Sequence, residues 1–195
     1  MSRPGLRERK KIETLHRVQE EAMRLFDEQG YDATTIEQIA AAAGVSPSTF
    51  YRYFPTKEDV VVQDEYDPMI IGVFQSQPEG VAPIDALRAT LTELFGQFTA
   101  EDMQRIHHRV ELIYSVPALQ ARQIRQTVAT ERMICDLVAA RAGRDPADLE
   151  VRNFAATLVA AWVTAITAWS EKGGQGNLLD YMDRCLTHLE AGVPL

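Results

Sequence analysis

The chain has 195 residues, of which 46% are apolar and 25% charged, and its formal charge at pH 7 is −8. This length fits one domain, or one domain with a small appendage, and the apolar fraction is enough for a real core. Two distant cysteines exclude a disulfide framework and indicate a reducing, cytoplasmic location, while the net acidity argues against nucleic acid as a partner unless the charges are unevenly distributed.

The N-terminal third begins with one long and one short predicted helix. Apolar residues recur at helical spacing over about residues 6–29, and Gly30 ends this helix. The next helix starts with Thr34 as its N-cap, because Glu37 three residues later completes a capping box. Gly44 ends the second helix.

Two further short helices are predicted to follow. Ser46 suits an N-cap, and the proline after it suits the first helical position. Phe50 and Phe54 lie one turn apart and can share a buried face. Thr56 then caps a fourth helix that runs to about Tyr66.

The remainder predicts longer helices and no strand, so the expected fold class is all-α with about nine or ten helices. These helices are expected over residues 83–98, 100–114, 117–142, 145–172 and 177–190. Residues 153–170 carry no charge, but they are too few and too polar to cross a bilayer, so a buried helix is expected and no membrane association.

Residues 34–57 form a helix–turn–helix pattern. Gly44 can take the left-handed conformation that reverses the chain within three residues, and Val45 is the apolar residue of the turn. The helix after the turn buries its two phenylalanines, which leaves Ser48, Thr49 and Arg52 facing outward. Such a helix can enter the major groove of DNA with its N-terminal side chains at the base edges.

These residues resemble the N-terminal signature of the TetR family of bacterial transcriptional regulators. The resemblance covers about the first 60 residues, and its motifs are residues 35–40, 43–46, 50–54 and 57–58. One departure is Ser48, where many members have glycine, and it bears on which base edges are read. The resemblance implies a three-helix DNA-binding bundle over residues 1–57, followed by a helical ligand-binding and dimerisation bundle over residues 58–195.

The resemblance also implies roles in DNA binding. The candidates in the motif are Thr35, Ser46, Ser48, Thr49, Tyr51, Arg52, Tyr53 and Lys57. Thr35 and Lys57 would contact phosphate. The side chains at or near base edges would be those of Ser46, Ser48, Thr49 and Arg52. Tyr51 and Tyr53 would touch phosphate or a thymine methyl. Ser46 is a cap first, and the alternatives are packing for Tyr53 and solvation for Arg52.

The basic N-terminal arm adds Arg3 and Lys10 to the candidates. Residues 1–11 carry five basic residues and one acidic residue. Such an arm can lie along phosphates or in the minor groove, and the alternative is a solvated tail. No apolar stretch follows the arm, so no secretory signal is expected.

The C-terminal body supplies candidates for an effector pocket and a dimer interface. The pocket candidates, each of which could equally be ordinary core, are Phe95, Phe98, His107, Tyr114, Met133, Trp162 and Trp169. Residues 153–170 have apolar groups on two faces, so this helix needs two partners, such as its own core and a second subunit. The dimer candidates are Val159, Val163, Ile166, Met182, Leu186 and Leu189.

The predicted function is that of a homodimeric, ligand-responsive repressor that binds double-stranded operator DNA and releases it when an unknown small molecule binds. The alternatives are an interaction module of the same fold that no longer binds DNA, and an all-α enzyme. No catalytic motif, metal-ligand spacing or cofactor motif is found, so no enzyme activity, metal or cofactor is expected.

The uneven distribution of charge answers the objection raised by the net acidity. Residues 1–57 contain nine basic and eight acidic residues, whereas residues 58–195 contain 11 basic and 20 acidic ones. The acidity therefore belongs to the C-terminal body, and the predicted DNA-binding part is close to neutral.

Overall fold

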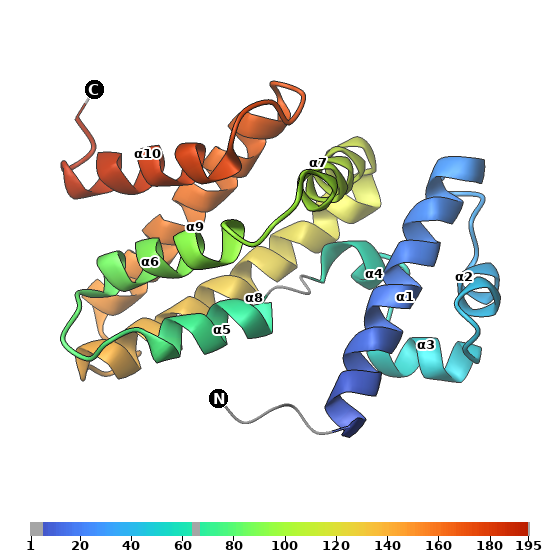
Figure 1. Cartoon of the computed structure of the whole chain (residues 1–195), viewed down its shortest axis with the longest axis horizontal. Helices are drawn as coiled ribbons and strands as arrows, with labels where there is room; N and C mark the ends of the chain where they lie inside the picture. The colour runs from blue at the N-terminus through green and yellow to red at the C-terminus, as the bar shows by residue number, and fades with distance from the viewer. Residues whose placement is uncertain (1–5, 64–66, 195) are drawn as a thin grey trace. The chain divides into compact units, whose positions relative to one another are not determined.

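The computed structural model describes residues 6–63 and 67–194, and these residues form ten helices and no strand (Figure 1). The all-α prediction is therefore confirmed. The chain divides into two units. The first comprises Met1–Glu65 with Ile113–Gln123, and the second comprises Tyr66–Leu112 with Ile124–Leu195.

The first unit contains one long helix and three short ones around a small core. They are α1 (Leu6–Gln29), α2 (Ile36–Ala42), α3 (Pro47–Tyr53) and α4 (Asp59–Val62). Helix α1 packs against α2 and α4, and α2 packs against α3. The predicted pair Phe50 and Phe54 is fully buried, with ring centroids 5.6 Å apart. The apolar face of α3 is thereby fixed toward the core.

The start of α2 differs from the prediction by one residue. Thr35, and not Thr34, is the N-cap: its hydroxyl accepts the Gln38 N–H at 3.2 Å, and the Gln38 side chain accepts the Thr35 N–H at 2.8 Å. Thr34 is buried, and its hydroxyl lies 2.8 Å from the Gly30 carbonyl oxygen. Because that hydroxyl is used at the end of α1, the neighbouring threonine supplies the cap.

Helix α4 is shorter than predicted. Thr56 and Asp59 form reciprocal hydrogen bonds, in which the Asp59 carboxylate accepts the Thr56 N–H at 2.9 Å and the Thr56 hydroxyl accepts the Asp59 N–H at 3.3 Å. The helix itself ends at Val62. The predicted end at Tyr66 lies outside the described residues.

The second unit contains the remaining described helices. They are α5 (Asp67–Ser76), α6 (Pro83–Phe95), α7 (Ala100–Ser115), α8 (Pro117–Ala142), α9 (Leu149–Ser170) and α10 (Leu178–Glu190), with the end of α7 and the start of α8 belonging to the first unit. Helix α5 was not predicted: residues 67–68 looked like a break, but a proline in the first turn needs no N–H partner. Helix α9 starts at Leu149 and not at residue 145, because Asp145 opens a turn in which its carboxylate accepts the Ala147 N–H.

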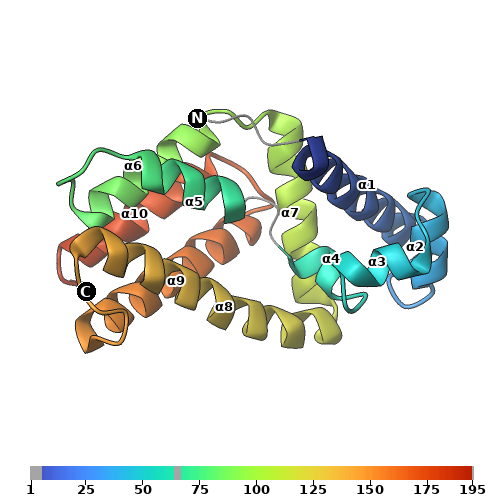
Figure 2. The ribbon, with the colours of Figure 1, turned by 90° about the horizontal axis from the view of Figure 1, so that it is seen from below.

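Helix α9 contributes most to the core of the second unit. Helix α10 packs against α9 and α6, and α5 packs against α6 (Figure 2). Helix α9 has 22 residues and contains an 18-residue window with a mean hydropathy of 1.3, which makes it long and apolar enough to cross a membrane by those two measures alone. Its buried residues are Val151, Ala155, Leu158, Val159, Trp162, Ala165 and Trp169. They belong to the apolar cluster at the centre of this unit.

Candidate nucleic-acid interface

The N-terminus of α3 is organised by Ser46. Its hydroxyl accepts the Thr49 N–H at 3.1 Å and donates to the Thr49 hydroxyl at 3.0 Å. Gly44 has a φ of +64°, a conformation that glycine adopts without the steric cost of a Cβ, and it sets the turn before the helix. Ser46 is therefore a cap that also orients the side chain of Thr49, which keeps its own hydroxyl hydrogen for another acceptor.

The outward face of α3 carries the predicted base-contact residues. Ser48 and Arg52 are exposed, Thr49 is partly exposed, and Tyr51 is 48% exposed with its ring against the edge of Phe50. The Ser48 hydroxyl forms no hydrogen bond with any residue that the structure describes. A helix face with free hydroxyl groups and one cation is chemically suited to base edges and phosphates.

Arg52 and Tyr53 interact with each other. The Arg52 guanidinium carbon lies 4.9 Å from the centre of the Tyr53 ring, and one guanidinium nitrogen lies 3.4 Å from the Tyr53 hydroxyl. Tyr53 is partly buried, so it packs and also supports the exposed arginine. This contact reduces the freedom of the arginine before any ligand arrives.

Thr35 lies at the N-terminus of α2 and is exposed. Its hydroxyl accepts the Gln38 N–H and retains its own hydrogen, which is free to bind an oxygen of a phosphate. Gln29 donates to the Gln38 side-chain oxygen at 3.0 Å and thereby holds the glutamine in place. Gln38 was not among the sequence candidates, although a glutamine three residues after a threonine is a capping signal.

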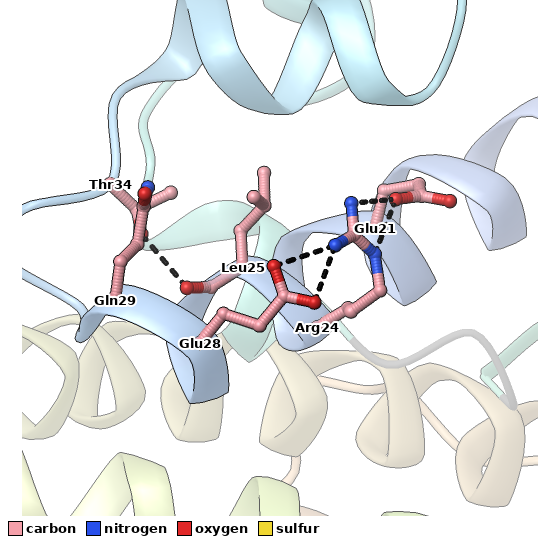
Figure 3. A network of polar contacts seen from close by, with 6 residues as sticks. All are labelled: Glu21, Arg24, Leu25, Glu28, Gln29 and Thr34. Carbon is pink, nitrogen blue, oxygen red and sulfur yellow. Dashed lines mark hydrogen bonds and ion pairs between the residues drawn. The ribbon is translucent and has the colours of Figure 1, made fainter.

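Arg24 on α1 is a cation that the helix itself neutralises. Its guanidinium binds Glu21 and Glu28, each at 2.7 Å, beside the contact of Thr34 with the Leu25 carbonyl (Figure 3). The exposed Lys10 stays a candidate for DNA contact, whereas Arg3 lies outside the described residues.

Lys57 has a structural role that the sequence did not indicate. Its ammonium donates to the carbonyl oxygens of Tyr31 at 2.9 Å and of Thr34 at 3.1 Å, and it lies 4.1 Å from the centre of the Tyr31 ring. Two of its three hydrogens therefore hold the loop between α1 and α2. Only the third could reach a phosphate, so the predicted phosphate contact is at most part of its role.

Tyr31 and Glu58 tie the same loop to the start of α4. The Tyr31 hydroxyl donates to the Glu58 carboxylate at 2.8 Å. Burial raises the pKa of Tyr31, and the carboxylate beside it raises this pKa further. Burial opposes ionisation of Glu58, but hydrogen bonds from its own backbone, from Tyr31 and from Thr56 outweigh it and lower the pKa of the carboxyl group.

Asp59 links α4 to the first turns of α8 within the first unit. Its side chain is 4% exposed, and one carboxylate oxygen accepts from the Arg122 guanidinium at 2.6 Å. The other oxygen accepts from Thr56. Local sequence patterns do not predict this pair, because its members lie 63 residues apart.

The effector candidates do not all come together. Phe95, Phe98 and Met133 are partly buried and pack against the apolar cluster that contains both tryptophans. Tyr114 is 45% exposed and belongs to the first unit, so it is not part of that cluster.

His107 is held by structural contacts. One ring nitrogen lies 3.2 Å from the Ser170 carbonyl oxygen, the other lies 3.5 Å from the Glu111 carboxylate, and the ring meets Trp169 edge-on. A Cβ on Gly174 would come within 2.7 Å of the same ring. These contacts fit a residue that closes the α9–α10 loop onto α7.

Three of the dimer candidates were misplaced. Val159, Met182 and Leu186 are almost fully buried in the core of their own chain, so they present no surface to a partner. Ile166 and Leu189 are partly buried, and Val163 is 38% exposed. These three residues are buried because the apolar face of α10 packs onto α9 within the same chain, so those faces of the two helices cannot contact a second subunit.

Two family models match the chain. Residues 19–63 match the model described as bacterial regulatory proteins, tetR family, and residues 81–194 match the model described as the MftR C-terminal domain. The second match covers more than half of the chain, and the two together agree with the division between an N-terminal helix–turn–helix and a helical body.

Individual proteins are similar as well. The HTH-type transcriptional regulator TcmR of Streptomyces glaucescens is 32% identical over 149 residues, which is 73% of this chain and 66% of TcmR, just under two thirds of that protein. The HTH-type transcriptional activator FasR of Mycolicibacterium smegmatis is 30% identical over 154 residues, or 76% of this chain and 68% of FasR.

A solved structure has a similar fold. The TetR family transcriptional repressor FadR of Thermus thermophilus, in complex with lauroyl-CoA, superposes with a TM-score of 0.57 at 24% identity. The superposition covers 93% of this chain and 95% of that one. At this identity the similarity bears on the fold alone.

Proposed function

The chain belongs to the tetR family of bacterial transcriptional regulators, and on that premise we propose that it is a ligand-responsive repressor that binds operator DNA as a homodimer. The observation that carries the proposal is the outward face of α3, where Ser46 fixes the hydroxyl of Thr49 beside the exposed Ser48 and Arg52. The first unit would carry DNA binding, and the second would carry effector binding and dimerisation in the cytoplasm.

The test is a gel shift of the full chain with the DNA upstream of its own gene and with a shuffled sequence of equal length. We expect salt-sensitive binding that prefers the upstream sequence. Binding with no sequence preference would contradict the proposal. Absence of binding to any DNA at low salt would favour the pure interaction module.

The homodimer is supported by the exposed face of α9. This face carries Asn153, Thr157, Ala160, Val163 and Thr164, and the chain has no charge between Arg152 and Glu171. A helix face in contact with water usually carries charged residues. The hydroxyls of Thr157 and Thr164 donate to carbonyl oxygens of their own helix at 2.7 and 2.9 Å, so their methyl groups are left for contact.

A symmetric dimer through this face would repeat the same patch on both subunits. It would also present two copies of α3 to two half-sites one helical turn apart, about 34 Å in duplex DNA. Val163 would lie in the interface, with Ile166 and Leu189 at its border.

Effector binding would favour an arrangement in which the two recognition helices no longer match their half-sites. Such a response requires the effector to bind the two arrangements with different affinities. Activation is the second candidate for the sign of regulation, because the similar FasR is named an activator. A reporter gene behind the upstream DNA, with and without the regulator gene, separates the two. Expression that rises when the regulator gene is deleted supports repression.

A regulator is favoured over an enzyme because the similar proteins are named as regulators.

A further inference from the structure

Trp162 on α9 carries a buried polar group without a partner. Its indole Nε1–H is fully shielded from solvent, and no residue that the structure describes provides a hydrogen-bond acceptor for it. The whole residue is 8% exposed. Buried tryptophan N–H groups normally find an acceptor, so this one calls for an explanation.

Two other buried polar groups of the same unit are satisfied. The indole N–H of Trp169 donates to the Gly176 carbonyl oxygen at 3.3 Å, and the buried hydroxyl of Thr90 donates to the Ala86 carbonyl oxygen at 2.7 Å. The fold therefore provides acceptors for these two donors, which sets Trp162 apart.

The surroundings of Trp162 define what kind of acceptor would fit. The cluster that contains it consists of apolar side chains from α5 to α10, and Phe95, Phe98 and Met133 pack against it from partly exposed positions. Among the described residues of the second unit, no Asp, Glu, Lys or Arg is buried, and Thr90 is the buried polar residue. An ionised group would lose its hydration there without gaining a counter-charge, whereas a neutral acceptor would gain the tryptophan N–H.

We infer that the indole N–H of Trp162 is the polar contact of the effector, and that the effector is an uncharged, largely apolar molecule with a hydrogen-bond acceptor such as a carbonyl oxygen. This inference rests on the proposed ligand-responsive function and adds the chemical class of the ligand. The apolar part packs against the cluster, and the acceptor meets the donor that the protein leaves free.

The probes are matched pairs of increasing size: acetophenone with ethylbenzene, 2-acetylnaphthalene with 2-ethylnaphthalene, and 4-acetylbiphenyl with 4-ethylbiphenyl. Within a pair the shapes are nearly equal, and one member has the carbonyl. The chain contains two tryptophans, so the ¹⁵N-labelled full-length protein gives two indole N–H resonances. The Trp162→Phe variant assigns them.

We expect an acetyl compound to shift the Trp162 indole proton downfield, as hydrogen bonding does, while its ethyl partner leaves that shift nearly unchanged. Trp162→Phe should weaken binding of the acetyl compound by about threefold to tenfold, the effect of one lost hydrogen bond, and should leave the ethyl compound unaffected. The matched control is Trp169→Phe, which should not change the ratio of the two affinities.

Three results would overturn the inference. The first is that no acetyl compound moves the Trp162 resonance. The second is that the resonance moves on dilution of the free protein instead, which would assign the acceptor to a second copy of the chain. The third is that both members of every pair shift the resonance equally. Where Trp162→Phe fails to fold, Trp169→Phe assigns the two resonances instead, and the wild-type spectra then decide these points.

The gel shift separates this inference from the proposed function. If an acetyl compound shifts the Trp162 resonance but does not release DNA, the contact between Trp162 and the ligand stands, and the result counts against ligand-controlled repression. Loss of DNA binding by the wild-type protein without any probe would count against the proposed function alone.

Discussion

The hydroxyl groups of Ser46 and Thr49 divide two tasks at the start of α3. Ser46 caps the helix by accepting the Thr49 N–H and donates its own hydrogen to the Thr49 hydroxyl, which keeps its hydrogen for another acceptor. The sequence suggested that both would lie near base edges. The geometry favours Thr49 as the residue that contacts a base edge and Ser46 as the residue that positions Thr49.

Thr49→Val should weaken binding to the matched operator by about 1–3 kcal/mol, because it removes the hydroxyl and keeps the shape. Thr49→Ser should retain most of the affinity. Binding to shuffled DNA should hardly change in either variant. Gel shifts at fixed salt measure all three, and equal losses on matched and shuffled DNA would show that Thr49 does not read a base.

Lys57→Met removes the ammonium and keeps much of the side-chain stem. We expect the free energy of unfolding to fall by about 1–3 kcal/mol, because two charged hydrogen bonds to the loop after α1 are lost. Urea denaturation measures this loss. If the third hydrogen also binds phosphate, the slope of log affinity against log salt falls by about 1 at a temperature where both proteins are folded. An unchanged slope would leave Lys57 with the structural role alone.

The ionisation of Glu58 should make the stability of the protein depend on pH. Its pKa is lowered from an ordinary value of 4.5 on folding, so its ionised form stabilises the folded state. That contribution is complete above pH 4.5 and disappears as the pH falls through the lower folded value. Wild type should therefore have a higher Tm than Glu58→Gln at neutral pH, and the difference should shrink on acidification below 4.5. A difference that stays constant down to the acid unfolding of both proteins would contradict this.

The short helices of the first unit show how much an element depends on contacts outside itself. Helices α2, α3 and α4 have seven, seven and four residues, lengths at which an isolated helix is not stable in water. Side-chain caps begin α2 and α3, and packing supplies the rest of their stability: α2 and α4 pack against α1, and α3 packs against α2. The contact between α4 and the beginning of α8 adds a charged link to this arrangement.

Arg122→Ala should destabilise the protein strongly, because it leaves the buried Asp59 carboxylate with only Thr56 as a partner. Loss of one member of a buried pair costs about 3–5 kcal/mol, and the partial exposure of Arg122 places this case at the lower end. The control is Arg125→Ala, an exposed arginine on the same helix, which should change stability by less than about 0.5 kcal/mol. Adding Asp59→Asn to Arg122→Ala should recover part of the loss in a denaturation experiment.

At the scale of the molecule, the proposed homodimer pairs through the uncharged face of α9. Ala160 lies on this face, and Ala160→Glu would put a charge into a symmetric interface twice. We expect this variant to sediment as a monomer at concentrations where wild type is a dimer, and to lose affinity for a two-half-site operator. Ala140→Glu, on the exposed side of α8, is the matched control and should stay dimeric.

The distribution of charge also belongs to this level. The acidic excess of residues 58–195 would repel phosphate, so only the near-neutral end with Arg52 and Lys10 would approach DNA. Arg24 is bound by carboxylates of its own helix, and Lys57 donates to carbonyl oxygens within the first unit. The cations that remain for DNA are therefore fewer than a count from the sequence suggests.

The sequence by itself determined the all-α class and most helix boundaries. Helix α1 ends at Gln29 before a glycine, Ser46 and Pro47 open α3, and Asn177 caps α10, as local patterns predicted. It also determined the helix–turn–helix and through it the family. These features depend on periodicity and capping within a few residues, so the order of side chains alone encodes them.

Only the tertiary structure decided which groups remain available. Thr35 and not Thr34 caps α2, because the Thr34 hydroxyl binds a carbonyl oxygen at the end of α1. Lys57 points inward because two carbonyl oxygens lie within hydrogen-bond distance. Val159 and Leu186 became core because α10 packs on α9, and Trp162 kept a donor without an acceptor. Each outcome depends on which distant segment occupies the space beside a side chain, and a single stretch of sequence does not carry that information.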